Sequence, residues 1–349
     1  MNLLQIVLFP FSWLYRLITD IRNWLYEEGY KKSIRFPVPV ISVGNLTVGG
    51  TGKTPHVEYL IRLLKDKYRI ATLSRGYGRK TKGFLLANDR IHAGDIGDEP
   101  MQFYRKFTGQ IQVAVGEKRV PAIDELLSRQ PVPEVIILDD AYQHRAVQPS
   151  FSILLSDYNR PFYRDYVLPS GRLRERRAGA KRADVILVSK CPEGLSKAEK
   201  QAITQEINSY AKPATPVYFT TIRYGQPVCF DTKPETFQGP VLLVSGLANA
   251  QPLEKYVQHT YTLSHHMALN DHHTYTAKDL DAISSQFMQV QAKHILVTEK
   301  DYVKLMHPDF AAQISRLPIW YLPIEVCFLF GEGQDFNEKV LNSLSEPPK

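Results

Sequence analysis

A glycine-rich segment at residues 44–54 limits the possible folds of this chain more than any other feature of its sequence. It reads Gly-Asn-Leu-Thr-Val-Gly-Gly-Thr-Gly-Lys-Thr, follows a short apolar run at residues 38–44, and leads into a helical pattern at residues 53–65. A phosphate-binding loop requires this order of strand, loop and helix, because backbone N–H groups and the helix N-terminus then surround phosphate oxygens. We therefore expect a nucleotide site, and a glycine turn with an incidental lysine is the less favoured alternative.

Seven consecutive residues of this loop are expected to contact the nucleotide: Val48, Gly49, Gly50, Thr51, Gly52, Lys53 and Thr54. Lys53 can reach the β- and γ-phosphates, and the hydroxyl of Thr54 can bind Mg²⁺. The usual pattern has glycine where Thr47 stands in this chain. We expect the Gly49-Gly50 pair to supply the missing backbone freedom, since glycine tolerates positive φ.

Two acids, Asp139 and Asp140, follow a second apolar run at residues 135–138. A site for Mg²⁺ and a nucleotide needs a carboxylate where a neighbouring strand leaves the sheet. Adjacent carboxylates at a strand end are costly unless a cation neutralises them. The sequence thus predicts Asp139 as a Mg²⁺ ligand together with Thr54, with Asp140 in support, although an ordinary acidic loop remains possible.

The rest of the chain alternates between apolar runs and helical patterns. Further strand candidates lie at residues 70–73, 151–155, 185–189, 241–244 and 295–298. This alternation predicts an α/β fold of the P-loop NTPase type, with a mainly parallel sheet and a second, smaller α/β domain. The expected parts are a kinase-like core at 31–216, a two-strand connection at 217–230 and 319–330, a smaller domain at 231–318 and a C-terminal segment at 331–349.

The first 30 residues are expected to form a helix that lies on a membrane surface. Residues 3–15 carry no charge, and apolar residues then recur at helical spacing up to residue 25. The uncharged run is too short to cross a bilayer, and it lacks the basic start and cleavage site of a signal peptide. The alternative is an amphipathic helix packed on the core of the protein itself.

The positive charge of the chain is concentrated in one segment. The 349 residues carry a formal charge of +7, and residues 160–182 contain eight basic and two acidic residues, or +6 of that total. Such a cluster predicts an anionic partner. No nucleic-acid-binding motif accompanies it, so we expect no nucleic acid and favour phosphate groups and an anionic membrane surface.

Three classes of nucleotide-dependent protein fit these motifs: GTPases, partition-type ATPases and kinases. Guanine-specific proteins carry Asn-Lys-x-Asp after a late strand, whereas the corresponding text here is Ser-Lys-Cys-Pro at residues 189–192. Partition-type ATPases carry a signature lysine where this chain has Val48. Both differences weaken a membrane-associated partition-type ATPase or GTP-binding switch, which we keep as the alternative to a kinase.

Taken in order, the motifs resemble those of the tetraacyldisaccharide 4'-kinase family, the lipid A 4'-kinases of Gram-negative bacteria. The matching segments begin with the loop at 44–55 and continue through the chain as Ser-Arg-Gly-Tyr-Gly-Arg at 74–79, Gly-Asp-Glu-Pro at 97–100, Asp-Asp-Ala-Tyr-Gln-His at 139–144, Leu-Pro-Ser-Gly-Arg-Leu-Arg-Glu at 168–175, Asp-His at 271–272 and Thr-Glu-Lys-Asp at 298–301. The one departure is Ala141, where the family commonly has glycine.

The resemblance implies transfer of the γ-phosphate of ATP, with Mg²⁺, to the 4'-hydroxyl of an acylated glucosamine disaccharide 1-phosphate, giving lipid IVA. It also implies a monotopic protein at the cytoplasmic face of the inner membrane. No obligate protein partner is evident from the sequence.

The resemblance also assigns roles to residues. Asp98 would be the base that accepts the hydroxyl proton, and His272 would orient or tune it, beside the catalytic contributions of Lys53, Asp139 and Asp140. Five further residues are expected to contact the substrate or support the site: Glu99, Arg119, His144, Arg174 and Glu175. Lys300 and Asp301 could contact a ligand or each other.

Overall fold

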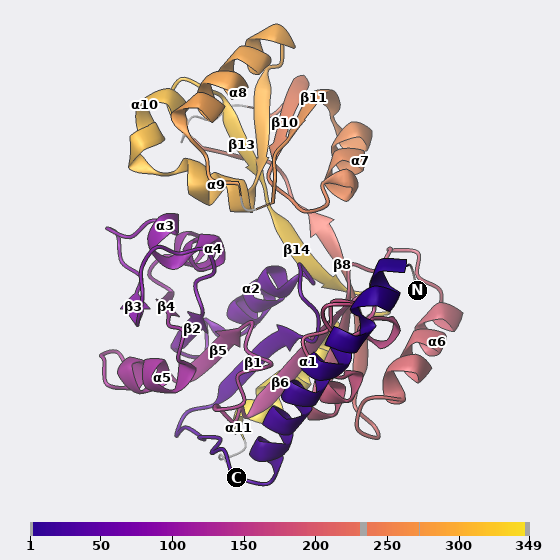
Figure 1. Ribbon diagram of the computed structural model, residues 1–349. Coiled ribbons are helices and arrows are strands. Elements are labelled where there is room, and N and C mark those ends of the chain that lie inside the picture. The colour runs from indigo at the N-terminus through magenta and orange to yellow at the C-terminus, as the bar shows by residue number, and fades with distance from the viewer. Residues whose placement is uncertain (1–2, 231–235, 272, 346–349) are drawn as a thin grey trace.

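The computed structural model describes residues 3–230, 236–271 and 273–345. Figure 1 shows a larger unit below and a smaller unit above, with strands β8 and β14 running between them. The larger unit is built on a nine-stranded sheet in the order β14-β8-β7-β6-β1-β5-β2-β4-β3. Its strands are β1 (Val40–Asn45), β2 (Ile70–Ser74), β3 (Leu85–Leu86), β4 (Ile111–Val115), β5 (Val135–Asp139), β6 (Phe151–Asp157), β7 (Val185–Ser189), β8 (Val217–Tyr224) and β14 (Ile324–Phe328).

This sheet is parallel from β8 to β4, and only its edge strands β3 and β14 run antiparallel to their neighbours. Every residue of β1, β2, β5 and β7 is buried. Burial on both faces explains why these strands read as continuous apolar runs rather than alternating patterns. The α/β fold expected from the sequence is confirmed.

Helices cover both faces of the larger sheet and flank its carboxyl edge. They are α2 (Lys53–Leu64), α3 (Ala93–Ile96), α4 (Asp98–Lys106), α5 (Arg119–Leu127), α6 (Lys197–Asn208) and α11 (Gly333–Ser345), with short 3-10 turns at Phe162–Arg164 and Arg177–Arg182. Phe336 and Val340 of α11 belong to the same buried cluster as Leu60 of α2 and Ile41 of β1. The end of the described chain therefore packs back onto the core of the larger unit.

The smaller unit has a five-stranded sheet in the order β11-β10-β12-β13-β9. Its elements are β9 (Val228–Cys229), β10 (Pro240–Ser245), α7 (Gln251–Thr260), β11 (Thr262–Ala268), α8 (Ala277–Gln289), β12 (His294–Thr298), α9 (Glu299–Leu305), α10 (Ala311–Ile314) and β13 (Ile319–Leu322), with a 3-10 turn at Pro308–Phe310. Four strands are parallel, and β9 pairs antiparallel with β13.

The segments expected to connect the two units have a structural role of their own. Strand β8 pairs with β7, and β14 pairs with β8, so both lie in the larger sheet. The sheet therefore extends beyond residue 216, where we placed the end of the core. Hydrogen bonding of β8 to β7 continues the sheet past this position.

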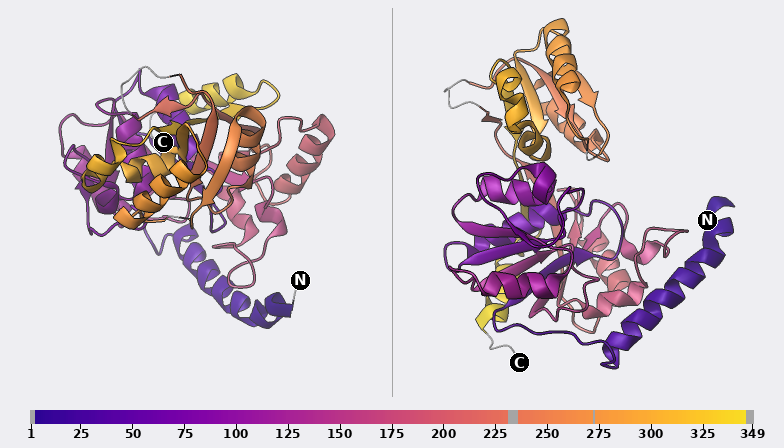
Figure 2. Two further views of the ribbon diagram at one scale, coloured as in Figure 1. Left: turned by 90° about the horizontal axis from the view of Figure 1, so that it is seen from above. Right: turned by 60° about the vertical axis from the view of Figure 1, so that its left-hand side comes forward.

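A 25-residue helix, α1 (Leu3–Glu27), lies along the larger unit. Its N-terminal half projects beyond the rest of that unit in both views of Figure 2. Several large apolar side chains on this helix are more than half exposed, including Phe11 at 61%, Trp13 at 62% and Ile18 at 59%. Within the part of the chain that the structure describes, no helix combines the length and apolarity needed to cross a membrane.

Candidate active site

The glycine-rich loop connects β1 to α2 at the carboxyl edge of the larger sheet. Gly49 and Gly52 have φ values of 108° and 78°, so each adopts a conformation that L side chains rarely take. The side-chain amide of Asn45 donates to Oγ1 of Thr51 at 2.9 Å, which ties the start of the loop to its end. This local geometry is that of a phosphate-binding loop at a helix N-terminus.

Thr47, which replaces the usual glycine, forms an isolated antiparallel bridge with Leu173. Hydrogen bonds on either side extend this contact: Val48 N donates to Arg172 O at 2.8 Å, and Arg174 N donates to Leu46 O at 2.7 Å. Because Thr47 is paired with a second backbone segment, this position has no need of the left-handed conformation that glycine provides.

Residues at the end of β7 contact backbone carbonyls of the loop. Ser189 Oγ donates to Thr51 O at 2.8 Å, and the ammonium of Lys190 contacts both Gly50 O and, at 2.8 Å, Asp157 Oδ2. The sequence had identified this Ser-Lys pair only as a poor match to a guanine-reading motif. Its contacts show that it supports the phosphate loop.

Lys53 lies at the first position of α2, with its ammonium 3.5 Å from Oδ1 of Asp140. Arg174 contacts the same carboxylate, with Nη1 at 3.1 Å from Oδ1. Burial opposes ionisation of Asp140, but Lys53 and Arg174 outweigh it and lower the pKa of this carboxyl. The structure thus brings together Lys53, Asp140 and Arg174, three residues expected in the site.

Asp139 is the last residue of β5 and lies opposite Val43 of β1, so the strand order places it beside the phosphate loop. Its side chain is buried, and Oδ1 has no hydrogen-bond partner among the described residues. Burial raises the pKa of Asp139 to about 7 although Lys53 opposes the rise. The nearby carboxylates of Asp140 and Glu99 raise it further.

A buried carboxylate oxygen without a partner is the kind of group that a bound cation stabilises. Asp139 could therefore hold Mg²⁺ beside the phosphate loop, with the hydroxyl of Thr54, the second residue of α2, as the expected second protein ligand. No group of three or more His, Cys, Asp or Glu side chains that could hold a metal occurs within the described ranges. A Mg²⁺ ion here would accordingly need phosphate oxygens and water to complete its shell.

Arg119 and His144 lie within electrostatic reach of these aspartates. Arg119 is 2% exposed and donates to the carbonyl oxygens of Gly116 and, at 3.3 Å, Asp139. Burial lowers the pKa of Arg119 to about 10, still well above neutrality. Burial lowers the pKa of His144 to about 4, and the charge of Arg119 adds to the effect, so the imidazole is neutral at pH 7.

Asp98 and Glu99 open helix α4, and α9 of the smaller unit lies against them (Figure 1). Asp98 Oδ2 is 3.1 Å from the ammonium of Lys304, and Glu99 Oε1 is 3.8 Å from that of Lys300. His272, the expected partner of Asp98, lies outside the described residues. Asp301, next to Lys300 in the chain, is buried within the smaller unit and accepts hydrogen bonds from Gly246 N at 2.9 Å and Thr298 Oγ1 at 2.6 Å.

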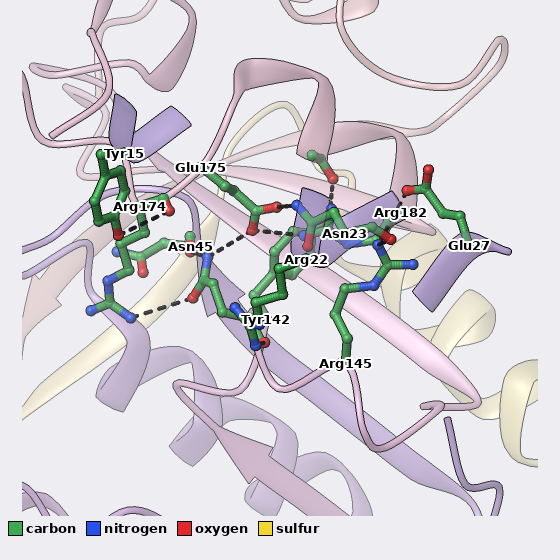
Figure 3. A network of polar contacts seen from close by, with 12 residues as sticks. Tyr15, Arg22, Asn23, Glu27, Asn45, Tyr142, Arg145, Arg174, Glu175 and Arg182 are labelled. Carbon is green, nitrogen blue, oxygen red and sulfur yellow. Dashed lines mark hydrogen bonds and ion pairs between the residues drawn. The ribbon is translucent and has the colours of Figure 1, made fainter. Parts of the chain in front are cut away.

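Glu175 lies in a buried polar network (Figure 3). Its Oε1 accepts from Arg182 at 2.7 Å and Gln143 at 3.1 Å, and its Oε2 accepts from Asn23 of α1 at 2.9 Å. Gln143 also donates to Asn45 O at 2.9 Å, which links the network to the end of β1. Glu175 thus joins the N-terminal helix to the strand that carries the phosphate loop.

Other polar residues of α1 also face the larger unit. Ser12 Oγ donates to Ser170 Oγ at 2.8 Å, and Arg176 Nε is 2.7 Å from Asp20 Oδ1. The polar side of α1 is therefore turned inward and its apolar side outward. Sequence reasoning missed these contacts, because nothing in a local pattern identifies partners about 150 residues away.

A parallel sheet, a phosphate loop and an acidic strand end define a P-loop protein that binds a nucleoside triphosphate. The family model described as Tetraacyldisaccharide-1-P 4'-kinase matches residues 4–345. The chain belongs to the tetraacyldisaccharide 4'-kinase family. This result does not favour a partition-type ATPase or a GTP-binding switch.

Relatives and a solved structure agree with that assignment. The chain is 44% identical to the tetraacyldisaccharide 4'-kinase of Flavobacterium psychrophilum, with 98% of this chain and 97% of the relative covered. It is 40% identical to the same enzyme of Bacteroides thetaiotaomicron, over 97% of this chain and 93% of the relative. The crystal structure of LpxK from Aquifex aeolicus in complex with ATP matches with a TM-score of 0.77 at 30% identity, covering 98% of this chain and 100% of that one.

Proposed function

We propose that this protein transfers the γ-phosphate of ATP to the 4'-hydroxyl of tetraacyldisaccharide 1-phosphate, which yields lipid IVA in lipid A biosynthesis. The observation that carries the proposal is a family match over nearly the whole chain, together with a phosphate loop whose geometry fits a nucleoside triphosphate. In the reaction, a bond forms between the 4'-oxygen and the γ-phosphorus. The bond from that phosphorus to the oxygen bridging the β- and γ-phosphates breaks.

The loop supplies positive charge where negative charge develops. Its backbone N–H groups and the N-terminus of α2 would contact the phosphates, and Lys53 would contact the β- and γ-phosphates. Lys53 is paired with Asp140, which also contacts Arg174. This pairing orients the Lys53 ammonium toward Asp140, directly after the end of β5.

The metal expected in the site is Mg²⁺, held by Thr54 and Asp139. When bound, Mg²⁺ would neutralise charge on the β- and γ-phosphates. Two observations support this ligand set: Oδ1 of Asp139 is buried without a hydrogen-bond partner among the described residues, and the pKa of its carboxyl is raised. Both indicate that a bound cation would stabilise the ionised carboxylate.

Asp98 would accept the proton of the 4'-hydroxyl as the phosphoryl group transfers, and His272 would orient it. The position of Asp98 supports this role, because Glu99 beside it acts on the pKa of Asp139 and so lies within electrostatic reach of the proposed metal ligand. Asp98 also contacts the smaller unit through Lys304. The substrate would therefore react where the two units meet.

The protein would carry out this reaction at the cytoplasmic face of the inner membrane. Helix α1 turns its apolar side outward, as a helix buried to one side in a lipid headgroup region would. A polar groove of about 610 Å³ near the start of α1 has Gln5 and Ser170 in its lining, and its charged residues are Arg160, Arg164, Arg172 and the one acid Asp165. Its charge suits the 1-phosphate of the acceptor or the phosphates of anionic lipids.

The test is incubation of the purified protein with ATP labelled in the γ-phosphate and the disaccharide 1-phosphate in mixed micelles, followed by lipid separation. We expect label in the lipid fraction with ATP and Mg²⁺, and loss of that label in Lys53→Ala. GTP hydrolysis without any labelled lipid would contradict the proposal and favour a switch protein.

A further inference from the structure

Two lysines of α9 connect the smaller unit to the start of α4. Lys304 Nζ is 3.1 Å from Asp98 Oδ2 and donates to the backbone oxygen of His273 at 3.0 Å. One turn earlier, Lys300 Nζ is 3.4 Å from Asp271 Oδ1 and 3.8 Å from Glu99 Oε1. Each lysine therefore bridges an acid of the larger unit and a residue that follows β11, either Asp271 or His273.

Lys304 is the more enclosed of the two, with a side chain only 8% exposed, compared with 18% for Lys300. An ammonium taken out of water must be well paired, and a lysine fixed in this way loses the rotamer freedom of its long stem. The contacts of Lys304 with Asp98 and with the backbone at residue 273 therefore define one arrangement rather than one of many.

We propose that Lys304 is a positioning residue for the phosphoryl transfer. Its ammonium holds the carboxylate of Asp98 beside the backbone of His273, so that the base meets the 4'-hydroxyl in one orientation. This inference rests on the proposed function and on the role of Asp98 as the base. A misplacement of about 1 Å in such an arrangement can lower a rate about 100-fold.

A separate ion cluster docks the two units, so Lys304 is not needed for that purpose alone. Lys106, at the far end of α4, has its ammonium 2.7 Å from Glu58 Oε2 and 2.5 Å from Glu299 Oε1 of α9. Glu58 is fully buried, and its Oε1 also accepts a hydrogen bond from Gln102 Nε2 at 2.8 Å. This cluster contacts none of the proposed catalytic groups, and Lys106 therefore provides a matched control.

The test compares Lys304→Met with Lys106→Met in the full-length protein. Lys304→Met should lower kcat at least about tenfold while changing the KM for ATP less than about threefold, because the phosphate loop is untouched. Lys106→Met should lower the melting temperature and retain kcat. If Lys304 acts through Asp98, the double variant Lys304→Met/Asp98→Asn should be no slower than Asp98→Asn alone.

Three results would overturn the inference: kcat within about twofold of the unaltered protein, an equal loss of kcat in Lys106→Met, or a double variant slower than Asp98→Asn by the full single effect. Lys304→Gln, whose amide can still donate to the backbone oxygen of His273, replaces Lys304→Met if the latter does not fold. Failure of the proposed function itself is distinguishable, because the unaltered protein would then transfer no phosphate to the disaccharide.

Discussion

Replacing Glu175 should destabilise the protein in two measurable steps. The side chain is 4% exposed and accepts hydrogen bonds from Arg182, Gln143 and Asn23. Glu175→Gln keeps the shape but removes the charge that pairs with Arg182, which should lower the free energy of unfolding by about 2 kcal/mol. Glu175→Met likewise removes the charge that pairs with Arg182 and also removes all three acceptor contacts, which should lower it by about 3–5 kcal/mol.

Urea unfolding monitored by tryptophan fluorescence measures both values. The surface residue Glu125, paired with Arg129 and 44% exposed, provides the matched control, since Glu125→Gln should change stability by less than about 0.5–1 kcal/mol. Glu175→Met combined with Arg182→Met should recover part of the loss, because no unpaired charge then remains. Glu175 variants as stable as the Glu125 control would refute the view that this network holds α1 in place.

Three further results follow from the structure. Burial lowers the pKa of His144 to about 4, so below about pH 6.5 the unfolded chain binds a proton that the folded protein does not yet bind. Lowering the pH from about 7 to about 4.5 should therefore reduce the free energy of unfolding of the unaltered protein by up to about 3 kcal/mol more than that of His144→Gln, as measured by urea unfolding. Burial raises the pKa of the Cys191 thiol to about 12, so iodoacetamide at about pH 8 should label it only in urea, and peptide mass spectrometry showing fast native labelling would contradict this. Trp13→Glu places a charge on the exposed apolar side of α1. It should weaken co-sedimentation of the protein with vesicles of anionic phospholipid without lowering the melting temperature. Unchanged co-sedimentation would exclude that side as the membrane contact.

The parts of the fold that the sequence predicted well are those determined by local chemistry. The phosphate loop was recognisable because its glycines, Lys53 and Thr54 lie close together in the sequence, at residues 49–54. Strands buried on both faces appear in the sequence as continuous apolar runs, so the central strands could be located from these runs alone. The position of Asp139 could be predicted because a carboxylate directly after such a run emerges at the carboxyl edge of a parallel sheet.

Other features depend on contacts between distant segments, which a single sequence does not display. The role of Glu175 depends on Asn23, about 150 residues earlier, and nothing in the text around either residue indicates the pair. In the same way, α11 returns to pack Phe336 on the core, although no local pattern distinguishes it from a free C-terminal helix. Lys304 follows a recognisable motif, but its contact with Asp98 arises only from the docking of α9 on α4.

The orientation of α1 illustrates the same limit. Its amphipathic pattern was compatible with a helix packed on the core and with a helix at a membrane. Polar contacts such as Ser12 with Ser170 place the polar side inward, which leaves Trp13 and its apolar neighbours outward. The sequence showed that two faces exist, and tertiary hydrogen bonds determine which of them is exposed.

The position of the new phosphate tests the central claim most directly. After reaction with ATP, the lipid product should be isolated and examined by phosphorus–proton correlation NMR. The account predicts a second phosphomonoester that correlates with the proton at the 4'-carbon, and no such product from Asp98→Asn. A phosphate on any other oxygen, or release of inorganic phosphate with the disaccharide unchanged, would contradict it.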